Sequence, residues 1–163
     1  MIVNLWNHFF SDGNLVIFGQ LALATILGAL IGMERRLAKK TAGMRTFALV
    51  SSGSALFSII SQLAFENFIG SSYDPSRIAS QVVVGIGFIG AGSILSSQNK
   101  VRGLTTAAGL WVSAAIGMAV AYKLYSIAIF ATMVTISILV VLWFFEHKLI
   151  KQMGSLAADD GED

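Results

Sequence analysis

Residues whose types could do chemistry are few in this chain, and they form two clusters. The first combines one carboxylate with basic side chains and hydroxyls: Glu34, Arg35, Arg45, Lys100, Arg102, Thr105 and Thr106. Such a set could bind a ligand or an ion. The alternative, which we favour at this point because basic loops set the orientation of membrane proteins, is a structural clamp and a topology signal.

The second cluster consists of Asp74, Arg77 and Gln81, with Glu66 as a candidate neighbour. Arg77, Gln81 and Gly85 recur every four residues and therefore share one face of a helix. Ionisable or amide side chains that enter a membrane span are candidates for function. The alternative is that Asp74 caps the helix, Arg77 reaches the lipid headgroups and Gln81 bonds to a neighbouring helix.

Catalytic and metal chemistry have little support. The chain has no cysteine, and its two histidines, His8 and His147, lie far apart, which argues against a zinc site and against a Ser/His/Asp arrangement. Magnesium or calcium needs several oxygen ligands together, whereas Glu34, Glu66 and Asp74 are dispersed. We therefore expect neither an enzyme nor a cofactor. The metal-binding residues stay unknown, and magnesium binding stays open.

The dinucleotide-binding pattern GxGxxG is matched by Gly85, Gly87 and Gly90. That motif requires a preceding strand, a following soluble helix and a later acidic residue. Here it lies inside the apolar run RIASQVVVGIGFIGAGSIL, residues 77–95, which is about as long as a bilayer is thick. A membrane helix that lets other helices come close explains these glycines better.

The composition is that of a multi-pass membrane protein. Hydrophobic residues make up 55% of the 163 residues and charged residues only 12%, half of the roughly 25% usual in soluble domains. The net charge of +2 is too small to indicate a nucleic-acid partner. We predict an all-α fold in one transmembrane domain, residues 1–151, with five spans at about 15–33, 44–65, 77–95, 104–122 and 124–145. An acidic tail, 152–163, is expected to be disordered.

Small residues mark the surfaces on which these helices should meet. The predicted helix-packing glycines are Gly28, Gly32, Gly85, Gly87, Gly90 and Gly92. Ala24, Gly28 and Gly32 recur every four residues and form a small-residue seam on the first span. A further seam, on the fourth span, consists of Gly109, Ser113, Gly117 and Ala121. Gly87 shares a helix face with Val83 and Ala91, so a bulky side chain at Gly87 should push helices apart.

Positive charges are distributed unevenly between the two sides of the predicted bundle. Nine Lys and Arg residues fall on one side, and only Arg77 and Lys123 fall on the other. The positive-inside rule then places the N-terminus outside, the C-terminus and the first cluster in the cytoplasm, and the second cluster outside. Only ten residues separate Glu34 from Arg45, and an unpaired charge at the membrane boundary is costly, so we expect an ion pair or a shared hydrogen-bond network between these two residues.

Three blocks of this sequence resemble the signatures of the MgtC/SapB family. They are MERRLAKKTAGMRTFALVSSGSALF, DPSRIASQVVVGIGFIGAGSIL and VRGLTTAAGLWVSAAIGMAVAY, and they cover roughly Ala24 to Tyr122. The resemblance adds Thr46 to the first cluster. The family pattern falls on Glu34, Arg35, Ala42, Gly43, Arg45, Thr46, Asp74, Arg77, Gln81, Gly85, Gly87, Gly90, Gly92, Gly103, Leu104, Thr105, Thr106, Ala107, Ala108 and Trp111.

The resemblance implies a small bacterial inner-membrane protein involved in magnesium homeostasis or adaptation to low magnesium. In some pathogens the family is linked to survival inside host cells, and many members regulate other membrane proteins. We therefore expect a regulator that contacts the bilayer and other membrane proteins and forms a homo-oligomer, with a dimer as one option. The alternative is a cation (magnesium) transporter or channel that uses Asp74, Gln81 and Glu34. We expect the chain to lack the C-terminal cytosolic domain of some members.

Overall fold

The computed structural model describes residues 12–63, 74, 76–97, 100–145 and 148. Its helices are α2 (Asp12–Leu37), α3 (Met44–Leu63), α4 (Ser76–Gly92), α5 (Leu104–Ala121) and α6 (Tyr125–Ser137), the last continued by a π-helical turn, η1 (Ile138–Leu142). Two short antiparallel strands, β1 (Leu95–Ser97) and β2 (Lys100–Arg102), join α4 to α5. The predicted all-α membrane class is confirmed, whereas the hairpin was not expected from the sequence. The predicted tail, 152–163, lies outside the described residues.

Among the described residues, four helices are long and apolar enough to cross a membrane: Gly13–Leu37, Met44–Leu63, Leu104–Ala121 and Tyr125–Phe145. By contrast, α4 ends at Gly92, before the predicted end of the third span at residue 95. The chain turns there because the amide and the hydroxyl of Ser93 both donate to Gly90 O, at 3.0 and 2.7 Å. The 17 residues of α4 measure about 25 Å at 1.5 Å per residue, which is less than the roughly 30 Å of a hydrocarbon core.

The first predicted span, 15–33, is shorter than the helix that forms. Helix α2 continues to Leu37, so Glu34 and Arg35 lie in its last turns rather than in a loop. The helix ends where Lys39 adopts a positive φ of 54° and the amide of Lys40 donates to Arg35 O at 3.0 Å. A left-handed residue that ends a helix in this way supplies donors to its last carbonyls.

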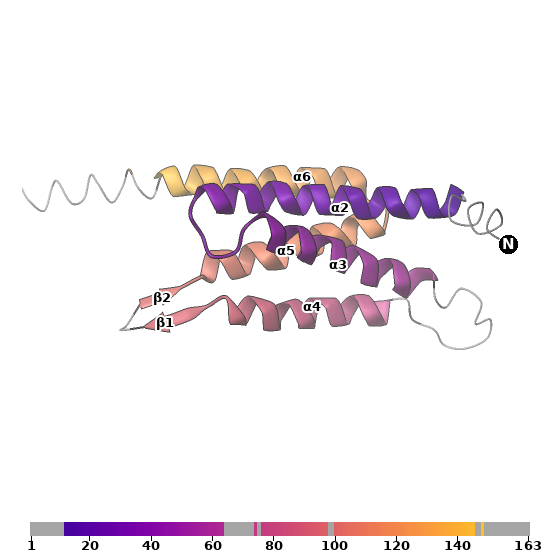
Figure 1. Ribbon diagram of the computed structural model, residues 1–163, viewed down its shortest axis with the longest axis horizontal. Coiled ribbons are helices and arrows are strands. Elements are labelled where there is room, and N and C mark those ends of the chain that lie inside the picture. The colour runs from indigo at the N-terminus through magenta and orange to yellow at the C-terminus, as the bar shows by residue number, and fades with distance from the viewer. Residues whose placement is uncertain (1–11, 64–73, 75, 98–99, 146–147, 149–163) are drawn as a thin grey trace, which may run out of the picture.

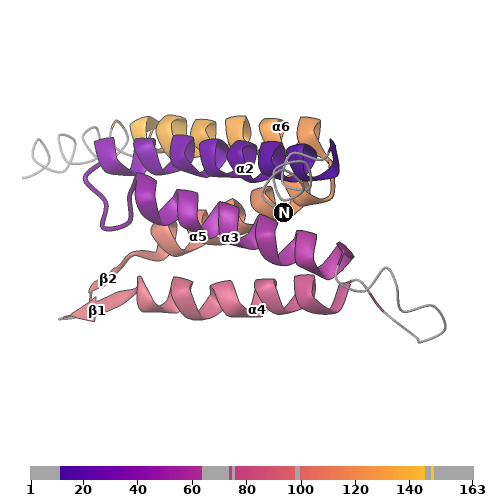
Figure 2. The same cartoon turned by 45° about the vertical axis from the view of Figure 1, so that its right-hand side comes forward.

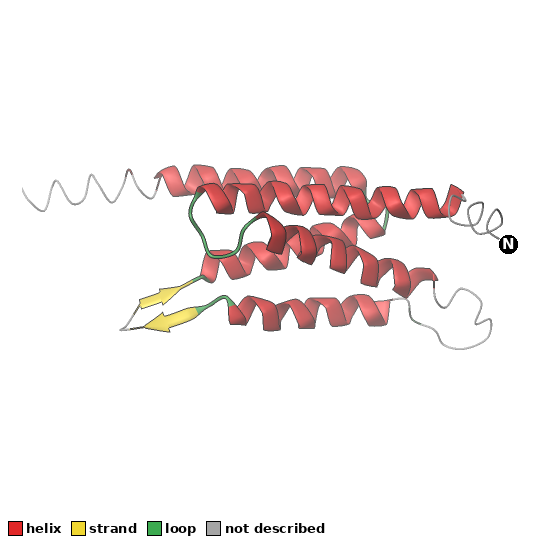
Figure 3. Cartoon of the chain, in the orientation of Figure 1, coloured by secondary structure: helices red, strands yellow, loops and turns green. Residues whose placement is uncertain are grey.

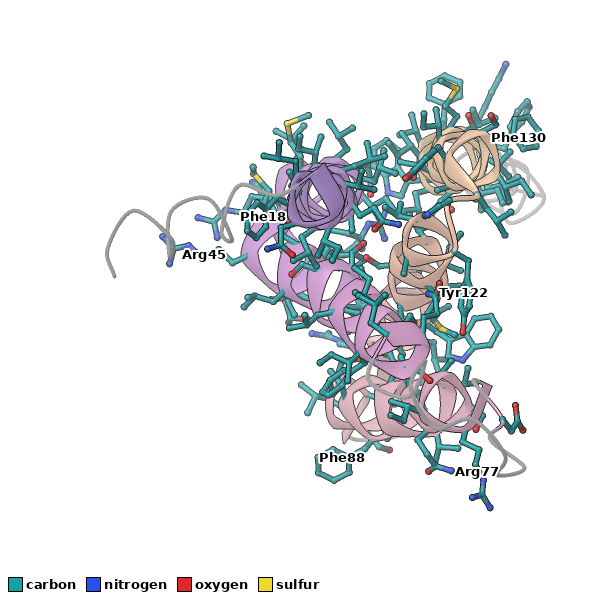
Figure 4. The ribbon with its side chains drawn as sticks, turned by 90° about the vertical axis from the view of Figure 1, so that its right-hand side faces the viewer. Phe18, Arg45, Arg77, Phe88, Tyr122 and Phe130 are labelled. Carbon is teal, nitrogen blue, oxygen red and sulfur yellow. The ribbon has the colours of Figure 1, made fainter. Side chains whose placement is uncertain are left out.

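Helices α2, α3 and α5 pack against one another at the centre, and α4 and α6 flank them (Figures 1 and 2). Viewed along the bundle in Figure 4, α4 lies against α3 and α5, and α6 lies beside α2 and α5. The buried core includes Ile31 of α2, Phe47 of α3 and Leu110 of α5. Along α6 and η1 only three residues are buried: Ala128, Thr132 and Leu139. This edge position agrees with a helix that faces lipid.

The central helices meet at one point of α3, which we call the Ser51 junction. A β-carbon at Gly28 of α2 would lie 2.5 Å from Phe47 O and 2.7 Å from Ser51 Cβ. A β-carbon at Gly117 of α5 would collide with Ser51 O, and Ser113 Oγ donates to Phe47 O at 3.1 Å. Glycine therefore lets both neighbours reach the backbone of α3, which leaves no open space at the junction.

Basic residues gather at one end of the bundle, which we call the basic end. The α2–α3 loop, the hairpin and the end of α6 all lie there (Figures 1 and 3). Its exposed basic residues include Arg36, Lys39, Lys40, Arg45, Lys100 and Arg102. Arg77 at the start of α4 and Lys123 between α5 and α6 lie at the opposite end. The fold thus collects in space the charges that the sequence predicts on one side.

Candidate functional site

The carboxylate of the first cluster is already engaged. Arg35 Nη2 donates to Glu34 Oε1 at 2.7 Å, and Arg35 Nε donates to Glu34 Oε2 in a second, short hydrogen bond. Arg35 is 3% exposed and Glu34 15%, so this bidentate pair is largely shielded from solvent. Such a fork-shaped pair fixes both geometry and charge. Glu34 is therefore not an open ligand for a cation.

The predicted Glu34–Arg45 ion pair is wrong. Because α2 extends to Leu37, Glu34 sits on a helix beside Arg35, whose guanidinium reaches it without any loop closure. Arg45 is exposed at the start of α3 and makes no ion pair with any residue that the structure describes. The shortness of the loop brought two helix ends together but did not decide which charges would face each other.

The other members of the first cluster do not converge on Glu34. Lys100 and Arg102 are exposed on β2, and Thr105 is exposed in the first turn of α5. Thr106 is buried, and Thr46 is half-buried next to Arg45. The cluster thus divides into a buried pair, an exposed basic hairpin and a separate Arg45–Thr46 corner.

That corner opens into a groove between α3 and α4. The volume of the groove is about 680 Å³, which is within the roughly 300–1,000 Å³ range of ligand pockets. It is lined by Arg45, Thr46, Leu49, Val50, Gly53, Ser54, Phe57, Ile78, Gln81, Val82, Gly85, Ile86 and Ile89. Arg45 is the only charged residue among them, and the remainder is mostly apolar.

The second cluster is also divided by the structure. Gln81 and Gly85 line the groove, so they do share the face that their spacing predicts. Arg77 is exposed and points away from the bundle in Figure 4, and it does not line the groove. Asp74 is exposed just before α4 and accepts, through its carbonyl, a backbone hydrogen bond from Arg77 N at 3.2 Å. Glu66, the candidate neighbour, lies outside the described residues, as do His8 and His147.

The candidate packing glycines fall into two groups. Gly28 and Gly32 press against the backbone of α3, where a β-carbon at Gly32 would lie 2.6 Å from Met44 Cα. A β-carbon at Gly90 would lie at an ordinary contact distance, 3.7 Å, from Ala107 Cβ of α5. Within the described chain, three glycines of α4 do not make the predicted close helix contacts, since β-carbons there would meet no described atom within 4 Å: Gly85, Gly87 and Gly92. The reason is position, because α4 flanks the bundle and turns most of its surface outward.

Two amides outside the predicted clusters close the far end of the bundle. Gln20 is buried, and its Nε2 donates to Val120 O at 3.0 Å and to Ala121 O at 2.9 Å. Gln62 Nε2 also donates to Ala121 O, at 3.3 Å. These contacts supply donors to the last carbonyls of α5, which lack a partner in the next turn of their own helix, and Val120 O accepts in addition from Lys123 N at 3.0 Å. A lone glutamine within an apolar span was the available signal.

No group of three or more His, Asp or Glu side chains that could hold a metal occurs among the described residues. The oxygen ligands of the described residues are scattered, whereas magnesium favours several ligands held together. The chemistry that the described geometry offers in the groove is therefore one guanidinium, two hydroxyls and one amide, from Arg45, Thr46, Ser54 and Gln81.

Comparison with known proteins places these features in a family. The sequence model described as the MgtC family matches residues 21–148. The chain is 44% identical over 136 residues to an Escherichia coli protein named "Putative magnesium transporter YhiD", covering 82% of this chain and 63% of that protein. It is 44% identical over 118 residues to Protein MgtC of Brucella abortus, covering 72% and 48%. It is 46% identical over 114 residues to Protein MgtC of Salmonella typhimurium, covering 70% and 47%.

The chain spans roughly half to two thirds of the length of these curated relatives. No solved structure matches it at a significant level.

Proposed function

The chain belongs to the MgtC family, and from that premise we propose that it is a non-enzymatic membrane protein of magnesium homeostasis that regulates other membrane proteins by contact. The names of the relatives support the link to magnesium, since one is called a magnesium transporter and others MgtC. In line with the basic end, we place the protein in the bacterial inner membrane with the N-terminus outside and the C-terminus in the cytoplasm.

The observation that supports the regulatory role is that the centre of the bundle is tightly packed, whereas the groove between α3 and α4 is open. At the Ser51 junction, Gly28 and Gly117 bring α2 and α5 onto the backbone of α3, so no space for a hydrated ion lies at that point. The carboxylate of Glu34 is held by Arg35. The groove between α3 and α4 lies at the flank of the bundle, where a membrane partner can reach it.

Transport of magnesium is the second candidate, and the groove is the observation that favours it. Gln81 lines one part of the groove and Arg45 another, so polar groups occur at two depths along α4 and α3. A cation would nevertheless meet a guanidinium at the basic end, which repels it. The described lining contains no carboxylate to offset that charge.

Two measurements on the same protein separate the candidates. Proteoliposomes with purified protein report magnesium uptake, and a deletion strain complemented with the gene reports growth at limiting magnesium. The regulatory role predicts rescue of growth together with uptake no faster than in protein-free liposomes. Saturable uptake that is abolished by the Asp74→Ala or Gln81→Ala change would overturn it. The topology is checked by a reporter fused after Lys148, which should read cytoplasmic.

A further inference from the structure

The groove has the length of a lipid chain. Helices α3 and α4 are antiparallel neighbours, so the lining runs from Arg45 to Phe57 on α3 and from Ile89 back to Ile78 on α4. Phe57 lies twelve residues after Arg45, and twelve steps of about 1.5 Å correspond to roughly 18 Å along α3. One leaflet contributes about half of the roughly 30 Å hydrocarbon core, so the groove spans about one leaflet.

The walls of the groove suit an unbranched apolar chain. Gly53 of α3 and Gly85 of α4 line it, and a β-carbon at either position would meet no described atom within 4 Å. Most of the remaining lining is aliphatic or aromatic, and Leu49 at its edge is 71% exposed. The space is thus open sideways to the bilayer and lacks the side chains that would fill it.

The basic end of the groove is suited to a phosphate. Arg45 is exposed and unpaired among the described residues, in contrast to Arg35, which is neutralised by Glu34. The hydroxyl of Thr46 makes no hydrogen bond to a described residue and lies in the first turn of α3. The first amides of a 20-residue helix add unsatisfied donors and the positive end of its dipole.

We propose that the groove binds one anionic phospholipid from the leaflet at the basic end, with its phosphate at Arg45 and Thr46 and one acyl chain along Gly53 and Gly85. Basic pockets between membrane helices on the cytoplasmic side are places where anionic headgroups bind. Exposed basic residues of the α2–α3 loop and the hairpin add to the attraction. The proposal does not depend on the regulatory role.

Charge argues for lipid over a second copy of the chain. A two-fold dimer in one membrane, with its axis along the bilayer normal, keeps both basic ends on the same side. If the two copies met through this groove, Arg45 would approach the same residue of its partner at the same depth. Like charges placed face to face disfavour such an interface, whereas a phosphate is complementary.

Native mass spectrometry of delipidated protein tests the proposal, with phosphatidylglycerol, phosphatidylcholine and inorganic phosphate added separately. We expect one phosphatidylglycerol to bind about fivefold or more tightly than phosphatidylcholine, and free phosphate not to bind detectably. The Arg45→Gln change should remove the preference between the two lipids. The Arg77→Gln change, at the opposite end, is the matched control and should keep it.

The acyl-chain site is tested by filling the groove. Gly85→Leu should reduce binding of phosphatidylglycerol about tenfold, whereas Gly87→Leu, on the same helix but outside the lining, should leave it unchanged. If Gly85→Leu does not fold, Leu49→Trp at the exposed edge replaces it. Equal binding of both lipids by the wild type would overturn the proposal. Undiminished binding of phosphatidylglycerol by the folded variant that fills the groove, Gly85→Leu or its replacement Leu49→Trp, would overturn it as well.

A second copy in the groove is the remaining outcome. The chain has no native cysteine, so Gly53→Cys provides a single reporter thiol in the groove. Efficient disulfide-linked dimers formed in the membrane would show that another chain occupies the groove and would likewise overturn the proposal. We expect the thiol to stay uncrosslinked in bilayers that contain phosphatidylglycerol.

Discussion

Two glycine-rich surfaces of this protein have opposite fates. At the Ser51 junction, Gly28 and Gly117 let two helices touch the backbone of a third. On α4, Gly85 and Gly87 have no described atom near the position of a β-carbon, and Gly85 borders a groove. The same residue type therefore builds the tightest contact of the described bundle and one of its most open surfaces.

The difference teaches that glycine permits close approach but does not produce it. At the junction, α3 lies between α2 and α5, so each glycine has a backbone opposite it. Helix α4 flanks the bundle and meets α5 near its end, where Gly90 contacts Ala107. An unopposed glycine leaves space instead of contact, and that space is available to lipid or to another protein.

Gly117→Leu should have the largest effect on stability. The side chain would collide with Ser51 O, a backbone atom that cannot move aside, so we expect a cost above the roughly 3 kcal/mol that is usual for overpacking. Gel filtration in detergent should show the loss of most monodisperse protein. If the variant kept the yield and thermal midpoint of the wild type, Gly117 would not be a close contact between α5 and the backbone of α3.

Breaking the buried ion pair should have the next largest effect. Glu34→Gln leaves Arg35, which is 3% exposed, without its carboxylate, and we expect a loss of about 3 kcal/mol in unfolding free energy. Arg45→Gln is the control and should cost less than about 0.5 kcal/mol, because its charge is exposed and unpaired among the described residues. Thermal unfolding of both variants and of the double variant measures their coupling. Coupling above about 1 kcal/mol between these two positions would restore the Glu34–Arg45 pair.

Gln20→Leu should destabilise the closed side more moderately. The change removes the hydrogen bonds from Gln20 to Val120 O and Ala121 O, although Lys123 N still donates to the first carbonyl and Gln62 Nε2 to the second. We expect a cost of about 1–2 kcal/mol in thermal unfolding. Gln81 is an exposed amide that lines the groove, so Gln81→Leu should change the unfolding free energy by less than about 0.5 kcal/mol. Equal effects of the two changes would contradict the distinction between closed and open regions.

Gly87→Leu should have the smallest effect on stability, and it tests whether this face of α4 is open. No described atom lies near a β-carbon at Gly87, and leucine favours the helix over glycine by up to about 1 kcal/mol. Folded yield and thermal midpoint should therefore equal or slightly exceed those of the wild type. A clear loss of yield would mean that Gly87 faces another chain in an oligomer.

Much of the architecture was predictable from local patterns. Apolar runs separated by polar segments predicted the helices, because an apolar run of bilayer length satisfies its backbone hydrogen bonds in lipid by forming a helix. The seam of Gly28 and Gly32 followed from spacing on a single helix. The early end of α4 was not predictable in this way, since it depends on Ser93 bonding back to Gly90 O in competition with further helix.

The sequence by itself determined the membrane class, the main helices and the gathering of basic residues at one end. These follow from hydrophobicity and charge, which act residue by residue. The pairing of Glu34 with Arg35 is local to α2, but it became visible only once the structure showed that α2 continues to Leu37. Only the tertiary structure decided that Gln20 would reach the end of α5 and that Gly85 would border empty space. Both depend on what lies opposite a side chain, and that is set by the packing of helices far apart in sequence.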